Sequence, residues 1–298
     1  MAGEPILVSG MPRSGNTWLA RLLATATGTA LTGREPMNPR GRQYALAHTL
    51  PGWASVQTLT RRQSRALQSC YRGLNPMVYS RYGRRQWAAP LPGTRTIVKD
   101  PFAMLSLPAV VRATGARAVL VYRHPGAALT SYRRMGWQPD LEELQPVIEE
   151  RRRLGLDPVA ITDLPGVGEA SEPLAMGLFW AALYRIALND AVRVPGLIVV
   201  SHPEIASGGI AAGRRLLGEL DLTFTPESAA ELAREPGIID ASGSRGESSS
   251  LHNFDRDPGQ VASSWRLLLE PSEVEQIESV TRQVRTDLEA ARYDLSRS

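Results

Sequence analysis

The sequence predicts an α/β fold, a parallel β-sheet flanked by helices, built as a single domain over residues 1–298. Short apolar runs alternate along the chain with longer segments of helical periodicity, which is the pattern of a parallel sheet covered on both faces. A glycine-rich turn joins the first apolar run to the first helical segment, as in folds that bind phosphate. Hydrophobic residues make up 43% of the chain, an ordinary share for a globular protein.

The expected strands are continuous apolar runs, because a strand buried on both faces needs no polar side. They are residues 6–9, 96–98 and 118–122, with further strands expected at 197–201 and 30–32. The expected helices are residues 17–26, 102–113, 127–135, 174–192, 210–217 and 272–291. Helices thus alternate with the strands, except after residues 30–32, as in the connections between parallel strands.

Two stretches interrupt this alternation, at about residues 34–93 and 137–173. We interpret both as helical insertions at the carboxyl ends of strands, where such segments shape a substrate site. The first is rich in arginine and aromatic residues, the second in proline, glycine and acidic residues. Residues 241–260, with three consecutive serines, are expected to form a mobile loop.

Composition narrows the setting in which the protein works. The single cysteine, Cys70, excludes an intrachain disulfide, and no run of eighteen apolar residues indicates a transmembrane segment. The first residues lack the basic start of a secretory signal, so we expect a cytoplasmic protein. The net charge of +4 fits a solvated surface as well as an anion site. Of 34 basic residues Lys99 is the one lysine, which suggests a special role for it.

The segment from Gly10 to Thr17 has the spacing of a nucleotide phosphate loop, GxxxxGK followed by Ser or Thr. Asn16 stands where that loop has its lysine. Backbone N–H groups and the helix N-terminus favour an anion there. A plain glycine turn is the alternative interpretation. The expected binding residues are Arg13, Ser14, Gly15, Asn16, Thr17 and Trp18.

Segment 12–19, PRSGNTWL, resembles the 5′-phosphosulfate loop of the sulfotransferase family. The resemblance covers roughly residues 5–35 and 96–136, with a weaker similarity at 196–205 and near Trp265. It implies a P-loop NTPase-like sulfotransferase fold of bacterial type. It also implies the donor 3′-phosphoadenosine 5′-phosphosulfate (PAPS), the product adenosine 3′,5′-bisphosphate, a hydroxyl acceptor such as a small molecule or a carbohydrate, and no metal.

The same resemblance implies a second anion site at Arg123, which ends a strand, and Ser131, eight residues later. In sulfotransferases such a pair binds the 3′-phosphate, and a guanidinium fork with a hydroxyl suits that group. Alternatively, Arg123 caps the sheet edge. Trp265 and Arg266 resemble a late segment that lies over the cofactor, although its usual glycine is missing. His124 is interpreted as a turn residue.

Lys99 begins the string KDPF, which is typical of protein-tyrosine sulfotransferases, where the lysine faces the transferred group. Pro101 occupies the place of the histidine base of the cytosolic small-molecule enzymes, so no histidine base is expected there. Glu35, followed by proline as in the tyrosine and carbohydrate sulfotransferases, is the expected base. The expected catalytic set is Glu35, Lys99 and Arg13. Asp100 is interpreted as a helix N-cap, with a role as the base left open.

Neither the acceptor nor the oligomeric state follows from the sequence. The basic and aromatic insertion suits a sugar, an aromatic compound or an anionic acceptor, and contact with a membrane surface stays open. No nucleic-acid partner is expected, although such residues also suit nucleic acid. Two alternatives to the sulfotransferase remain: a magnesium-dependent P-loop kinase or NTPase, for which Asp100 could hold the metal, and a non-catalytic nucleotide- or nucleic-acid-binding protein.

Overall fold

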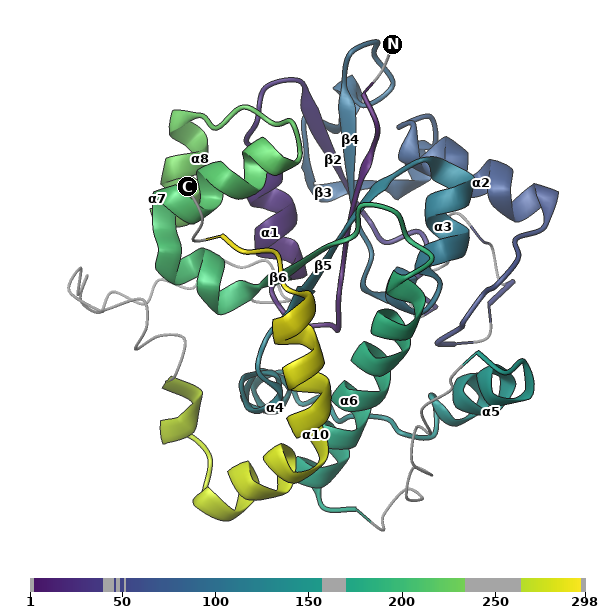
Figure 1. Ribbon diagram of the computed structural model, residues 1–298. Helices are drawn as coiled ribbons and strands as arrows, with labels where there is room; N and C mark the ends of the chain where they lie inside the picture. The colour runs from purple at the N-terminus through teal and green to yellow at the C-terminus, as the bar shows by residue number, and fades with distance from the viewer. Residues whose placement is uncertain are drawn as a thin grey trace.

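The computed structural model describes residues 3–39, 46, 49–50, 52–156, 170–233 and 264–295. Its centre is a six-stranded, mostly parallel sheet with helices on both faces (Figure 1), which confirms the predicted α/β class. The strand order is β3-β2-β4-β1-β5-β6. The loop expected at 241–260 lies outside the described residues.

Five strands are parallel, and each contains a predicted apolar run. They are β1 (Ile6–Ser9), β2 (Thr29–Gly33), β4 (Arg95–Lys99), β5 (Arg117–Tyr122) and β6 (Ile198–Ser201). The edge strand β3 (Tyr79–Arg84), antiparallel to β2, was not predicted. Its side chains are half-buried or exposed, so it lacks the apolar run of a central strand. The insertion at 34–93 is therefore only partly helical.

Predicted helices correspond to α1 (Asn16–Leu23), α3 (Leu107–Thr114), α4 (Pro125–Arg134), α6 (Glu172–Ala191), α7 (His202–Glu219) and α10 (Pro271–Ala291). The two insertions contribute α2 (Arg61–Tyr71) and α5 (Gln145–Arg153), and α8 (Pro226–Ala233) follows α7. Short 3₁₀ turns are η1 (Pro76–Val78), η2 (Gln86–Ala88), η3 (Pro101–Leu105) and η4 (Ser264–Leu267). The helix predicted at 102–113 is thus divided into η3 and α3.

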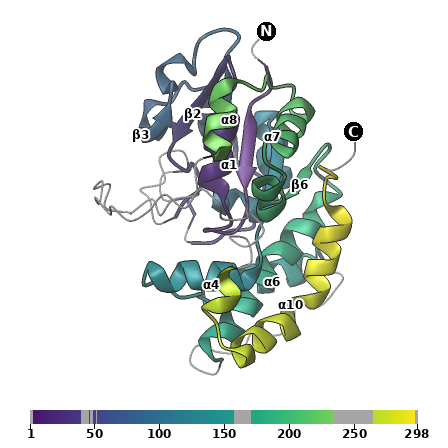
Figure 2. The same cartoon turned by 90° about the vertical axis from the view of Figure 1, so that its left-hand side faces the viewer.

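Alternate residues of the central strands enter two separate cores, because successive side chains of a strand point to opposite faces. On β1, Ile6 and Val8 pack in the core that includes residues of α1 and α7, whereas Leu7 packs in the core that includes residues of α3 and α6. Figure 2 shows α10 lying along α6, and a Cβ on Gly177 of α6 would lie 2.6 Å from Val280 of α10. Helix α10 thus extends the core that contains residues of α3 and α6 beyond the sheet.

A buried ion pair attaches α5 to α6. Arg151 donates to Asp190 at 2.9 and 3.2 Å, and both side chains are fully buried. Arg151 also donates to Ser55 at 2.8 Å. A buried pair of this kind is neutral or costly as a whole, but removal of one partner leaves an uncompensated charge.

We therefore expect Asp190→Ala to lower the free energy of unfolding by about 3–5 kcal/mol, because Arg151 would stay buried and charged. The double variant Arg151→Met/Asp190→Leu should recover most of the loss. Arg193→Ala, which removes the half-exposed second partner of Asp190, is the control and should cost less than about 1 kcal/mol. Urea denaturation measures all three, and a mild effect of Asp190→Ala would contradict the expectation.

Candidate functional site: a phosphate loop beside a lysine–glutamate pair

The phosphate loop connects β1 to α1 in a conformation that requires glycine at both ends. Gly10 and Gly15 have φ of +149° and +99°. A Cβ on Gly10 would lie 2.1 Å from the carbonyl oxygen of Val121, and one on Gly15 would lie 2.2 Å from the ring of His202. The loop is thus packed against the end of β5 and the start of α7, and its glycines are needed for close approach.

Asn16, at the position of the missing lysine, fastens the loop. Its side-chain nitrogen donates to the carbonyl oxygens of Gly10 and Met11, at 3.0 and 2.8 Å. The amide hydrogens are therefore used inside the loop, and its side chain supplies no positive charge. Thr17 is exposed on α1, and Trp18 packs edge-on against His202 with ring centroids 5.0 Å apart.

Two aromatic residues of α6, which no sequence pattern singled out, hold both anion motifs in place. The Tyr184 hydroxyl lies 2.9 Å from Ser14 Oγ and 2.8 Å from the carbonyl oxygen of Val121, and it accepts from the backbone N–H of Met11 at 3.2 Å. One turn earlier, Trp180 Nε1 donates to the carbonyl oxygen of Arg123 at 2.9 Å. In the sequence, their spacing of four residues in an apolar helix indicates only core packing, because the hydrogen-bond partners of their polar atoms are distant in the chain.

The two predicted anion motifs meet in a cluster of positive charge. Arg13 Nε donates to Ser131 Oγ at 2.8 Å. Burial, and then the positive charges of Arg13 and Arg134, lower the pKa of Arg123. Arg123 Nε is buried without a hydrogen-bond partner, and within the described residues neither Arg13 nor Arg123 has an ion-pair partner. A site with this much uncompensated charge favours an anion.

Trp265 and Arg266, both in η4, lie against the start of α4, where Trp265 packs on His124 and Gly126. The Trp265 indole stacks on the His124 ring at a centroid distance of 4.1 Å, and Arg266 lies over the indole at 4.9 Å. His124 Nδ1 accepts from the N–H of Gly126 at 3.1 Å, so His124 is the N-cap of α4, as expected for a turn residue. Burial, and then Arg285 and Arg266, lower the pKa of His124 to about 3. The ring is therefore a neutral acceptor at its cap.

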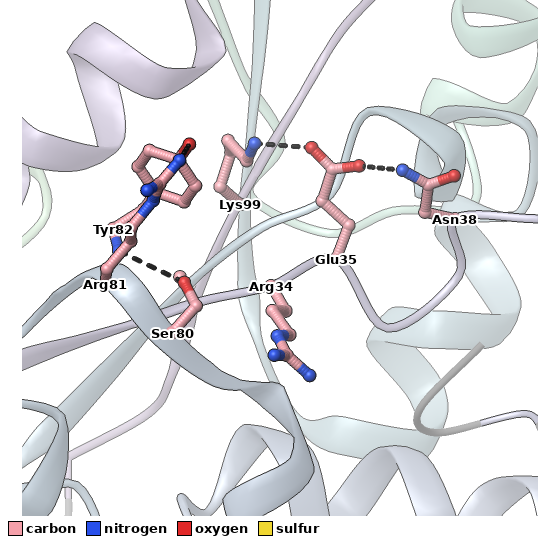
Figure 3. A pocket seen from close by; sticks show the side chains of 8 residues that line it. Arg34, Glu35, Asn38, Ser80, Arg81, Tyr82 and Lys99 are labelled. Carbon is pink, nitrogen blue, oxygen red and sulfur yellow. Dashed lines mark hydrogen bonds and ion pairs between the residues drawn. The ribbon is translucent and has the colours of Figure 1, made fainter. Parts of the chain in front are cut away.

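Glu35 and Lys99, two of the three expected catalytic residues, form an ion pair (Figure 3). Lys99 ends β4, and Glu35 follows β2, its neighbour in the sheet. Both side chains are largely buried, with 18% and 16% of their surface exposed. The side-chain nitrogen of Asn38 donates to the second oxygen of Glu35. Arg34 donates to the carbonyl oxygen of Met77 at 3.1 Å, and Lys99 is the ion-pair partner of Glu35.

This ion pair lines a cavity of about 550 Å³ between the ends of β2, β3 and β4. The lining residues are Gly33, Arg34, Glu35, Asn38, Ser80, Arg81, Tyr82 and Lys99. Arg13, the third expected catalytic residue, lies in the arginine cluster and not among them.

Asp100 is fully buried beneath the ion pair and serves as a structural acceptor. Its carboxylate oxygens accept the backbone N–H groups of Met37, at 2.6 Å, and Phe102, at 3.2 Å. The second bond is the predicted N-cap, here of η3. Burial, and then the negative charge of Glu35, raise the pKa of Asp100 to about 8. The oxygens of Asp100 are occupied by backbone N–H groups, and Asp100 does not line the cavity. Glu35 is therefore the better placed of the two carboxyl groups for chemistry.

The raised pKa of Asp100 predicts a pH dependence of folding. In the unfolded chain the carboxyl ionises near its ordinary pKa of 3.8, but in the folded protein it stays protonated up to about 8. Its stabilising contribution is therefore complete below pH 3.8 and is lost as pH rises towards 8. We expect Asp100→Asn, which resembles the neutral carboxyl, to flatten the fall in unfolding free energy between about pH 5 and about pH 8. Equal slopes for both proteins, measured by urea titration, would contradict this.

Within the described ranges, no group of three or more His, Cys, Asp or Glu side chains is placed to hold a metal ion. None of the helices in that part of the chain combines the length and hydropathy needed to cross a membrane.

A glycine-rich loop after β1, an arginine cluster after β5 and a lysine–glutamate pair after β2 and β4 thus lie along one edge of the parallel sheet. The chain belongs to the sulfotransferase family, whose sequence profile matches residues 5–154. That match contains the loop, Glu35, Lys99, Arg123 and Ser131. No curated protein sequence gives a significant match.

Several solved structures resemble the fold. The sulfotransferase domain of the Synechococcus PCC 7002 olefin synthase is 16% identical, with a TM-score of 0.48, 98% of this chain covered and 96% of that chain. The sulfotransferase domain of the curacin biosynthetic pathway is 16% identical, with a TM-score of 0.48 and coverage of 94% and 98%. Sulfotransferase STF9 from Mycobacterium avium is 14% identical, with a TM-score of 0.45 and coverage of 95% and 76%. The family membership rests on residues 5–154.

Proposed function

We propose that this protein is a single-domain cytoplasmic enzyme that transfers the sulfuryl group of PAPS to the hydroxyl of a small molecule or a carbohydrate, without a metal. The observation that carries the proposal is the Lys99–Glu35 ion pair beside the phosphate loop of a sulfotransferase family member. A base and a compact cation at adjacent strand ends provide what transfer to a hydroxyl needs.

The residues of the loop and of the arginine cluster fit the donor. The N–H groups of the loop, with Ser14 and Thr17, would hold the 5′-phosphosulfate at the N-terminus of α1. Arg123 and Ser131 would hold the 3′-phosphate, with Arg13 between the two groups. The buried Arg123 Nε, which has no hydrogen-bond partner, supports this assignment. Trp18 and Trp265 would offer apolar surfaces to the adenosine.

The bound donor supplies an electrophilic sulfuryl group and a bisphosphate leaving group. Glu35, paired with Lys99, accepts the proton of the acceptor hydroxyl as the hydroxyl oxygen attacks sulfur. Asn38 fixes the second carboxylate oxygen, which orients the base. Lys99 keeps a positive charge at the boundary between acceptor cavity and phosphate loop, where it can compensate negative charge that develops on the leaving oxygen.

The two alternatives account for fewer of these contacts. A kinase or NTPase needs a loop lysine on the transferred phosphate, whereas Asn16 is hydrogen-bonded inside the loop. A non-catalytic binding protein has no use for a largely buried Lys99–Glu35 pair that opens into a cavity.

Adenosine 3′,5′-bisphosphate should raise the melting temperature in the presence of EDTA, because the proposed site uses arginine and backbone N–H groups. Arg123→Ala should weaken this ligand about ten- to a hundredfold, while adenosine 5′-phosphosulfate changes much less. Calorimetric titration measures both affinities, with Arg282→Ala, an exposed residue of α10, as the control. An equal loss of affinity for both ligands would show that Arg123 does not bind the 3′-phosphate. Stronger thermal stabilisation by magnesium-ATP than by the bisphosphate would refute the proposed function.

Glu35→Gln should lower turnover by a factor of about 10² to 10⁴, because the amide cannot take the proton from the hydroxyl of the acceptor. The affinity for the bisphosphate should stay nearly unchanged. Asp100→Asn makes the same chemical change at a buried carboxyl that does not line the cavity, so it should mainly lower stability and retain turnover. Initial rates with PAPS and any working hydroxyl acceptor provide the measurement. Loss of turnover in Asp100→Asn with an active Glu35→Gln would show that the base is Asp100.

A further inference from the structure

His202 lies against the phosphate loop, although the proposed function gives it no role. It is the first residue of α7, which directly follows β6. A Cβ on Gly15 would lie 2.2 Å from His202 Cδ2 and 3.1 Å from Nε2, so this edge of the ring faces the loop. The ring also packs edge-on against Trp18, with ring centroids 5.0 Å apart. His202 therefore contacts the start of α1, where the 5′-phosphosulfate is assigned.

The polar atoms of the His202 ring are not used for packing the protein. His202 is only 6% exposed, yet in the part of the chain that the structure describes neither ring nitrogen makes a hydrogen bond or an ion pair. His124, by contrast, uses its Nδ1 to cap α4. A buried polar group without a partner costs free energy, so its presence beside a binding loop indicates a polar ligand.

Two neighbours of His202 also keep buried polar atoms without hydrogen-bond partners, namely Trp18 Nε1 and Arg123 Nε. Trp18 touches the His202 ring, and the positive charge of Arg123 is close enough to affect the titration of that ring. The three side chains come from α1, from the end of β5 and from the start of α7. Unpaired polar atoms of three separate elements thus gather around the two proposed phosphate sites.

His202 is uncharged at neutral pH. Burial, and then the positive charge of Arg123, lower the pKa of His202 to about 3. A neutral imidazole has one N–H donor and one acceptor nitrogen, so it contributes a directed hydrogen bond and no positive charge. Such a group suits a neutral oxygen of a ligand, whereas the arginines suit its phosphates.

We propose that His202 is a further donor-binding residue, whose Nε2–H donates to a ribose oxygen of the bound nucleotide. The inference rests on the proposed function and adds a contact to its donor site. The 5′ group of the donor is assigned to the loop and the 3′-phosphate to Arg123, so the ribose joins the two sites that His202 adjoins. His202 thereby recognises the part that nucleotides with and without a 3′-phosphate share, whereas Arg123 recognises the 3′-phosphate.

Two variants separate this hydrogen bond from the packing of the ring. His202→Phe keeps an aromatic ring against Trp18 but has no N–H, and His202→Gln has a side-chain N–H but no ring. In calorimetric titrations His202→Phe should weaken adenosine 3′,5′-bisphosphate and adenosine 5′-phosphosulfate equally, by about three- to tenfold, because one neutral hydrogen bond is lost. His202→Gln should stay within about twofold of the wild type for both ligands. The melting temperature of each unliganded variant is the control for folding.

The same titrations distinguish this inference from the proposed function. Wild-type affinity of His202→Phe for both ligands would overturn the inference and retain the donor site. A loss in His202→Phe that is confined to the bisphosphate would also overturn it, because the ring would then bind the 3′-phosphate. Failure of the wild-type protein to bind either ligand would refute the proposed function, and the inference with it.

A measurement on the wild-type protein decides the question if His202→Phe does not fold. The ring N–H signal of His202 in proton–nitrogen correlation spectra, assigned by its loss in His202→Gln, should shift when adenosine 3′,5′-bisphosphate is added. A signal that stays unchanged at saturation would overturn the contact.

Discussion

The proposed active site depends on one buried carboxyl group, that of Asp100. Its side chain holds the N–H of Met37, in the turn that carries Glu35, and caps η3. Its backbone N–H donates to the carbonyl oxygen of Val8 at 3.0 Å, and its own carbonyl accepts from Ser9 Oγ at 2.7 Å, directly before the phosphate loop. Asp100 thus connects the last residues before the phosphate loop, the end of β4 and the turn that carries Glu35. The raised pKa of Asp100 is the energetic cost of placing a carboxyl there.

Helix α6 supplies the second constraint. Trp180 and Tyr184 each reach a backbone carbonyl at the end of β5, and Tyr184 also contacts Ser14 of the loop. The separation between the two proposed phosphate sites is therefore set by one rigid helix. Asp100 sets the relation of the loop to Glu35, and α6 sets the relation of the loop to Arg123. A ligand with two anionic ends meets a preformed spacing, which reduces the entropy lost on binding.

Local patterns in the sequence predicted the loop, its helix and the five parallel strands, since each is encoded within a few residues. Contacts between distant residues were not accessible in this way. Tyr184 and Ser14 are 170 positions apart, and β3 lacks an apolar run, so neither was identified. Glu35 and Lys99 were selected separately, but their pairing follows from the adjacency of β2 and β4.

The distribution of positive charge explains why the loop can lack its lysine. A loop lysine serves a chain of phosphates that lies along one helix end. Here the charge comes from Arg13 and Arg123, which belong to different strand–helix connections. Arg13 donates to Ser131, and its charge helps to lower the pKa of Arg123. Arginine suits a terminal phosphate because its planar guanidinium contacts two oxygens at once. The position of Lys99, between Glu35 and a single oxygen on which charge develops, suits a compact ammonium group. The chain uses arginine for 33 of its 34 basic residues and lysine at this one point, so its composition agrees with the chemistry proposed for each site.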